Sequence, residues 1–143
     1  MNDRHRRSRG QALVEFALVF PLFLVLLFGF IDVGRLVYVN NAVAQAAREG
    51  ARWASVAGRV QAATYPTNIV TQTKNGMVAV PTPTVTVKCF LPTDLSLVTE
   101  PAVCVSGDIL QIKVTSKVDM LTPVIGQLIG SITVEATSQV VVN

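Results

Sequence analysis

Few residues of this chain have side chains suited to chemistry, and the two cysteines are the most informative. Cys89 and Cys104 are the only cysteines, and the single histidine, His5, lies near the N-terminus. A metal site would need further cysteine or histidine ligands at short spacing, so no metal is expected. The pair forms either a disulfide or two unpaired thiols. An exported, oxidising location favours the disulfide.

The remaining polar residues do not form a catalytic pattern. The carboxylates of the C-terminal half are scattered, without the spacing of a metal-binding loop or a close repeat. They are Asp94, Glu100, Asp108, Asp119 and Glu135. No histidine is available to activate a serine, and no glycine-rich phosphate or dinucleotide loop is present. The sequence therefore predicts a protein that is not an enzyme and that uses no cofactor.

One apolar segment dominates the chain. From Gln11 to Ile31 the sequence is almost entirely apolar, and residues 16–31 carry no charged or strongly polar side chain. An α-helix of about 20 residues crosses the ~30 Å of hydrocarbon in a bilayer. Residues 11–31 are therefore predicted to form one transmembrane helix in contact with lipid.

The charge distribution indicates the orientation of this helix. The whole chain has a net charge of +3, and the first ten residues account for all of it. No basic patch remains elsewhere to bind nucleic acid. Arginines that immediately precede a membrane helix stay in the cytoplasm, which predicts that the residues after Asp32 are exported. These arginines are Arg4, Arg6, Arg7 and Arg9.

Three fates are open to such a segment: a cleaved secretory signal, a permanent anchor, or a prepilin-type leader cut on the cytoplasmic side. The run is long for a secretory signal and does not end in small residues, which disfavours that fate. Glu15 bears on the other two, because a carboxylate inside a membrane helix costs on the order of 1–3 kcal/mol. It is either tolerated at the level of the lipid headgroups or retained for a task.

The polar-to-apolar boundary resembles a known processing site. A glycine after basic residues, four further residues, and then Glu15-Phe16 resemble the cleavage junction of type IVb prepilins and pseudopilins of the Flp/Tad system. More closely, residues 10–56 resemble the TadE-like family. The features that carry this resemblance are the Gly10 junction, the Glu-Phe-Ala stretch, Pro21 and the Ala-Arg-Glu-Gly-Ala-Arg segment at residues 47–52.

The resemblance implies that a prepilin peptidase in the bacterial inner membrane cuts between Gly10 and Gln11. Glycine leaves the backbone free to approach the protease in an extended form. Glu15 and Phe16 are implied to serve recognition and assembly. Glu15 is expected to face the new amine of Gln11, its own or a neighbour's, because the pair is less costly in lipid than a lone carboxylate. Pro21 is expected to kink the helix.

Apolar and small residues continue at helical spacing beyond the membrane, so residues 32–57 are predicted to extend the helix outward. From Gln11 to Ala57 such a helix is about 70 Å long. An alanine stripe on this part is predicted to pack against the protein's own sheet or against a neighbouring subunit. The stripe consists of Ala44, Ala47, Ala51 and Ala54. Gly58 and Pro66 are expected to bracket the helix end.

Residues 58–143 are predicted to form an extracytoplasmic β-rich domain. A short helix is expected over residues 67–76, and alternating patterns predict strands over 84–90, 108–118 and 132–142. Thr122-Pro123 could open a further short helix. The predicted fold class is α+β and pilin-like, with a small antiparallel sheet of three or four strands on the long helix.

These features predict a minor pseudopilin, a structural subunit for assembly of a Tad (Flp, type IVb) pilus or a related secretion machine. Its implied partners are the prepilin peptidase, other pilins or pseudopilins and the Tad inner-membrane assembly proteins. One alternative is an uncleaved signal-anchor protein that displays a small binding or adhesion module. Another is an accessory membrane protein of the same machine that never enters a fibre.

Overall fold

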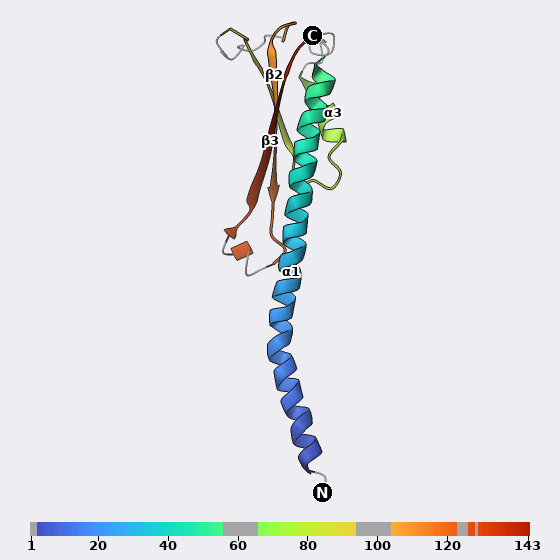
Figure 1. The fold of residues 1–143 in the computed structure, drawn as a ribbon, viewed down its shortest axis with the longest axis vertical. Helices are drawn as coiled ribbons and strands as arrows, with labels where there is room; N and C mark the ends of the chain where they lie inside the picture. The colour runs from blue at the N-terminus through green and yellow to red at the C-terminus, as the bar shows by residue number, and fades with distance from the viewer. Residues whose placement is uncertain (1–2, 56–65, 94–103, 123–125, 128) are drawn as a thin grey trace.

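A single helix runs almost the whole length of the molecule (Figure 1). The computed structural model describes residues 3–55, 66–93, 104–122, 126–127 and 129–143, with only the backbone for residues 3–9. Helix α1 spans Asp3–Ala54, 52 residues, which corresponds to about 80 Å. The sheet packs on its C-terminal half, and the N-terminal half projects alone.

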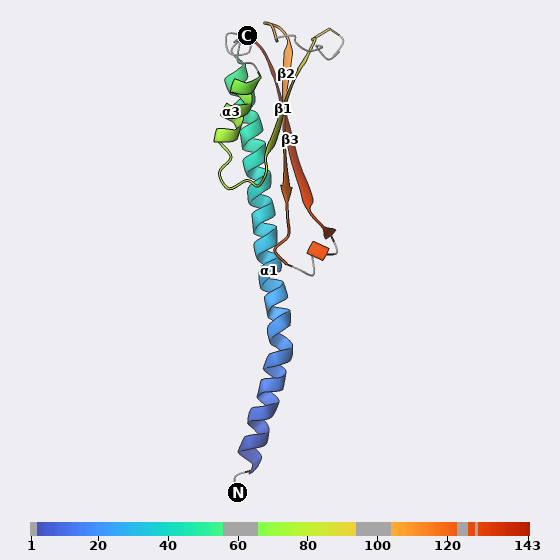
Figure 2. The ribbon, with the colours of Figure 1, turned by 180° about the vertical axis from the view of Figure 1, so that it is seen from behind.

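Helix α1 begins earlier and ends slightly earlier than expected. It includes the basic leader, because a single glycine costs a helix only about 1 kcal/mol and nothing else at Gly10 interrupts the backbone. It ends at Ala54, and the predicted stop at Gly58 lies outside the described residues. The N-terminal part of α1 is inclined relative to the rest in both views (Figure 2). Pro21 lies in this part, and its role as the cause of the bend stays a prediction.

Three antiparallel strands form the sheet in the order β1-β2-β3. Their bounds are Thr84–Phe90 for β1, Ile109–Val118 for β2 and Ile132–Val141 for β3. The register places Cys89 opposite Leu110 and Val114 opposite Ala136. The described sheet thus has three strands, at the lower end of the predicted number, and each strand lies within one residue of its predicted bounds. The α+β fold class is confirmed.

The core lies between α1 and one face of the sheet. Alternate residues of β2, beginning with Leu110 and Ile112, are buried, and the residues between them face outward. On α1 the buried positions recur every three or four residues. They are Val39, Val43, Ala46, Ala47, Gly50, Ala51 and Ala54. The protein's own sheet therefore covers this face of α1 (Figure 1).

The buried stripe is turned slightly from the one predicted. Ala47, Ala51 and Ala54 are buried as expected, but Ala44 is only half-buried and Ala46 takes its place in the core. Val33, which the helical spacing placed on the apolar face, is exposed. The helical period identified a stripe of the right kind, and the line along which the sheet lies decides which neighbouring residues it covers.

Helix α3, Thr67–Asn75, forms where the sequence predicted a short helix over residues 67–76, and the structure places it against α1 beside this core. It approaches so closely at Gly50 that a Cβ atom there would overlap the Thr73 hydroxyl. The Thr73 hydroxyl donates to the carbonyl oxygen of Ile69 at 2.8 Å within α3, and both residues are buried. The glycine of the 47–52 segment is therefore the point at which the two helices meet.

A disulfide joins Cys89 to Cys104, as predicted, with 5.8 Å between their Cα atoms. Both residues are buried. The bridge ties the end of β1 to the segment that leads into β2. In the chain-entropy model, closing a loop of this length stabilises a domain by about 3 kcal/mol.

Candidate functional site

The predicted processing junction lies within the first turns of α1. Gly10 is exposed, and a Cβ atom at this position would meet nothing within 4 Å. The structure places Gln11 and Glu15 on one face, where the Gln11 Nε2 donates to the Glu15 Oε1 at 3.3 Å. Phe16 stacks on Phe20 with 5.2 Å between ring centroids. Gln11 and Glu15 are thus brought together by the helical i, i+4 spacing.

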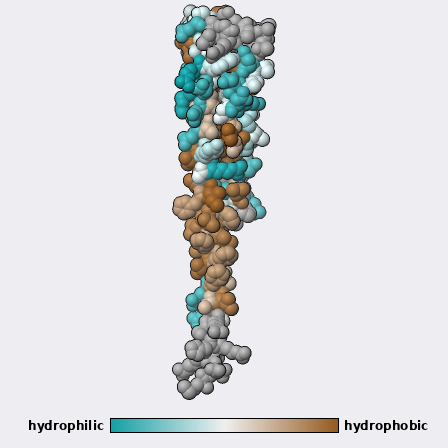
Figure 3. All heavy atoms as spheres, turned by 90° about the vertical axis from the view of Figure 1, so that its right-hand side faces the viewer, coloured by the Kyte–Doolittle hydropathy of each residue, from teal (hydrophilic) through white to brown (hydrophobic). Residues whose placement is uncertain are grey.

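The apolar run after this junction is long and apolar enough to cross a membrane, and it is the one such helix in the described chain. Most of its side chains, from Leu13 to Ile31, are exposed. Figure 3 shows them as a continuous brown band below a mostly hydrophilic half that contains the sheet. A band of this size on a free-standing helix needs lipid or other helices around it.

Asp32, the first charged residue after the apolar run, holds the sheet domain to α1. Its side chain is buried and accepts three hydrogen bonds from the β2–β3 connection. Its Oδ1 accepts from the N–H of Leu121 at 2.8 Å. Its Oδ2 accepts from the N–H of Thr122 at 3.0 Å and from the Thr122 hydroxyl at 2.6 Å.

These contacts also set the protonation of the carboxylate. The hydrogen bond from the Thr122 hydroxyl is the main influence that lowers the pKa of Asp32 below its ordinary value. Burial opposes this shift, whereas the two main-chain N–H groups and the charge of Arg35 reinforce it. The Asp32 carboxylate therefore favours its charged form, in which it accepts hydrogen bonds from donors at the edge of the domain.

Two further side chains of α1 continue this attachment. Arg35 donates from its Nη1 to the carbonyl oxygen of Asp119 at 2.9 Å. The Tyr38 hydroxyl donates to the carbonyl oxygen of Val78, in the segment between α3 and β1, at 2.8 Å. We call Asp32, Arg35 and Tyr38 the membrane-proximal clamp. Its members follow one another at intervals of three residues and fasten two loops of the sheet domain just beyond the apolar run.

Sequence reasoning missed this clamp. Asp32 was noticed only as the residue that ends the apolar run, and no pattern linked it to Thr122, 90 positions away. A signal was nevertheless present, because an acidic residue directly after a membrane helix can meet the donors of a folded domain lying on it. The structure therefore adds Asp32, Arg35 and Tyr38 to the residues of functional interest.

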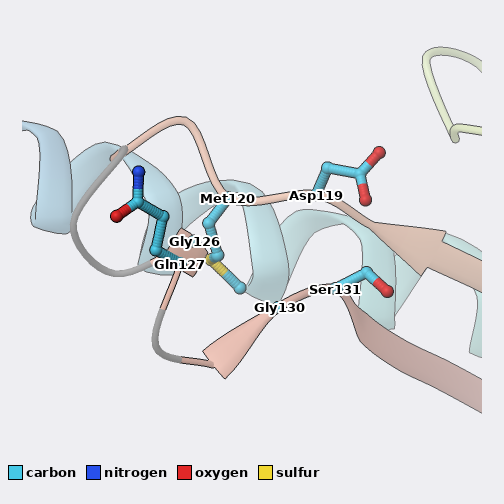
Figure 4. Close-up of a pocket in the computed structure, with 6 residues that line it drawn as sticks. All are labelled: Asp119, Met120, Gly126, Gln127, Gly130 and Ser131. Carbon is cyan, nitrogen blue, oxygen red and sulfur yellow. The ribbon is translucent and has the colours of Figure 1, made fainter.

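Shallow pockets lie among the described residues beyond the apolar run, including two on different elements. One, of about 300 Å³, is on the exposed face of α1. Its lining residues are Gln45, Arg48, Glu49 and Arg52, and the last two form an ion pair. The other, of about 480 Å³, is in the β2–β3 connection (Figure 4). Within the described residues, no group of three or more histidine, cysteine or acidic side chains is arranged to hold a metal.

Comparison with known proteins supports the resemblance at the N-terminal half. The family model described as TadE-like protein matches residues 10–52. This range covers the junction, the apolar run, the membrane-proximal clamp and Gly50, and it stops before the sheet. No curated protein and no solved structure gives a significant match. Over residues 10–52 the chain is therefore similar to the TadE-like family, in agreement with the resemblance carried by the sequence.

Proposed function

We propose that this protein is a minor pseudopilin, a structural subunit for assembly of a Tad pilus or a related secretion machine. Residues 11–31 hold it in the bacterial inner membrane, with its N-terminus in the cytoplasm and the sheet domain outside. The observation that carries the proposal is the form of α1, which runs unbroken from the junction through an exposed apolar band into the core of a small domain. The TadE-like match over the same residues supports it.

Processing after Gly10 is the first step of the proposed function. The bond from Gly10 to Gln11 is helical in the intact chain, so the first turns of α1 must unwind before a peptidase can bind this segment in an extended form. Gly10 favours this opening, because glycine lowers helix stability by about 1 kcal/mol relative to alanine. Its exposed position, with nothing near a virtual Cβ, leaves the approach open.

Pairing of Glu15 with the new N-terminus is the second step. Cleavage would place a charged amine on Gln11, one helical turn from Glu15 and on the same face. A carboxylate near a helix N-terminus is also favoured by the helix dipole. In lipid the pair is less costly than either charge alone, so a subunit is stabilised where its Glu15 meets an amine, its own or a neighbour's. This pairing would set the axial position of an incoming subunit.

The exchange Glu15→Gln tests this step. It removes the charge and keeps the size of the side chain, so the protein is expected to be processed but to be depleted from the isolated pilus or assembly complex. Glu49→Gln is the matched control, because Glu49 lies on the exported part of the same helix and is solvent-exposed. Wild-type incorporation of the Glu15→Gln protein would show that Glu15 has no role in register.

The alternatives predict different results in the same preparations. An uncleaved anchor that displays an adhesion module would keep residues 1–10 and would be indifferent to Glu15→Gln. An accessory protein of the machine would be processed but would be found with the membrane assembly proteins and never in sheared fibres.

A further inference from the structure

The connection between β2 and β3 differs in composition from the rest of the exported surface. Between Asp119 and Glu135 the sequence carries 15 consecutive residues without a charged side chain. Two of its large apolar side chains are exposed, Leu121 by 57% and Ile129 by 63%. The outer face of the neighbouring sheet, in contrast, carries the ion pair between Lys113 and Glu135. Exposed apolar groups in an uncharged segment indicate a surface that something apolar covers.

The position of this connection is fixed by the membrane-proximal clamp. The hydrogen bond from the Leu121 N–H to Asp32 places Leu121 beside the residue that follows Ile31, where the apolar run ends. A helix of 21 residues from Gln11 to Ile31 spans about 30 Å, which equals the hydrocarbon thickness of a bilayer. Figures 1 and 2 both show the β2–β3 connection as the part of the sheet domain nearest to the N-terminal half of α1. With α1 in the inner membrane, the connection therefore lies level with the boundary between lipid and water on the extracytoplasmic side.

The chemistry of the connection suits this boundary. Figure 4 shows an open notch in which Met120 lies between the two arms of the connection, with Asp119, Gln127 and Ser131 around it. Polar groups thus stand beside the exposed apolar side chains, as the mixed environment of lipid headgroups requires. On α1, Phe30 and Val33 are exposed on either side of the same level. Exposed apolar side chains are thus present at this level on both the connection and α1.

We propose that the β2–β3 connection is a second membrane contact, which lies on the outer leaflet beside α1 and inserts Leu121 and Ile129 among the lipid headgroups. The proposal rests on the placement of α1 in the membrane given above. The connection has no cationic residue between Asp119 and Glu135, so its contact is apolar and does not depend on anionic lipid. Together with α1, it attaches the exported domain at two points and restricts its tilt.

Fluorescence quenching in vesicles tests this contact with the full-length protein. Single cysteines are introduced by Leu121→Cys or Ile129→Cys and labelled with an environment-sensitive fluorophore, while the native cysteines stay in their disulfide. Both positions are exposed, so neither exchange disturbs the core. The proteins are reconstituted in phosphatidylcholine–phosphatidylethanolamine vesicles, with and without lipids brominated on the acyl chains.

Two further variants serve as controls. Phe23→Cys places the label within the apolar run and reports whether α1 crosses the bilayer. Val105→Cys is the matched aqueous control, because Val105 is 52% exposed and lies at the opposite end of β2. Peptide mapping under non-reducing conditions verifies that Cys89 is joined to Cys104 in each variant.

The labels at positions 121 and 129 are expected to show blue-shifted emission and quenching by brominated lipid, at a shallower depth than the label at 23. Neither added salt nor anionic lipid should change the result, and the label at 105 should not be quenched. Labels at 121 and 129 that behave like 105, while 23 is quenched, would overturn the contact and leave the placement of α1 intact. An unquenched label at 23 would overturn both. A blue shift without quenching that disappears when the protein is diluted would assign this face to a second copy and overturn the lipid contact.

Discussion

At the scale of single residues, Asp32 connects the two halves of the molecule. Its carboxylate lies at the end of the apolar run and accepts hydrogen bonds from Leu121 and Thr122, which are 89 and 90 positions away. Such a pairing depends on where the sheet lies along α1, so the sequence alone did not reveal it. Gln11 and Glu15, in contrast, are four residues apart on α1, and their side chains are in contact. The pairing of Glu15 with a new amine on Gln11 stays a prediction.

The exchange Asp32→Ala should loosen the domain from α1. It leaves the buried N–H and hydroxyl of Thr122 and the part-buried N–H of Leu121 without their acceptor, and each buried group costs about 1–3 kcal/mol. The free energy of unfolding is expected to fall by at least about 1–3 kcal/mol. Trp53 fluorescence of the protein in detergent micelles measures the change. Asp119→Ala is the control, because the Asp119 side chain is exposed. Arg35 donates to the main-chain carbonyl oxygen of Asp119, which the exchange keeps. Equal losses in the two variants would contradict a specific role for Asp32.

The same carboxylate predicts a pH dependence. Because the pKa of Asp32 is lowered in the folded protein, the unfolded chain binds a proton more readily, and the contribution of Asp32 is fully present above its ordinary pKa of about 4. It is lost as the pH falls through the lower folded value. The stability difference between wild type and Asp32→Asn should therefore be constant above about pH 5 and shrink below about pH 4. A difference that grows on acidification would contradict this assignment.

At the scale of elements, the sequence predicted the strands well because each carries a local alternation, and it predicted α3 from the residues that bound it, Pro66 and Gly76. The alternation in β2 matches its buried and outward residues one by one. The line of contact on α1 was less predictable. Residues 44 and 46 are both alanines, and only the position of the sheet decides which of them is buried. Gly50 shows the same limit, because its function depends on Thr73 of another helix.

Gly50→Ala tests the close approach of α1 and α3. The new methyl group would overlap the Thr73 hydroxyl, so the free energy of unfolding should fall by about 1–3 kcal/mol despite the better helix propensity of alanine. Gly34→Ala, on the same helix with nothing within 4 Å of its Cβ position, should instead raise stability by about 0.5–1 kcal/mol. Adding Thr73→Ala to Gly50→Ala should restore part of the loss. Similar effects of the two glycine exchanges would argue against the close contact.

At the scale of the whole molecule, the sequence predicted a long apolar helix with a small disulfide-linked sheet domain, and the structure confirms both. The helix is long and apolar enough to cross a membrane. The predicted membrane segment rests on composition and charge, which need no tertiary information. The way the domain sits on the helix could not be read in advance. Its edge nearest the N-terminal half of α1 is held by the membrane-proximal clamp at the end of the apolar run, which fixes the domain relative to the helix.

The proposed processing can be measured directly at the N-terminus. The intact mass and N-terminal sequence of the protein extracted from membranes of cells with an active prepilin peptidase should correspond to a chain that begins at Gln11. Gly10→Ala should retain residues 1–10, whereas an ordinary anchor would be unaffected by this exchange. A wild-type protein that still carries residues 1–10 in such cells would contradict the pseudopilin account.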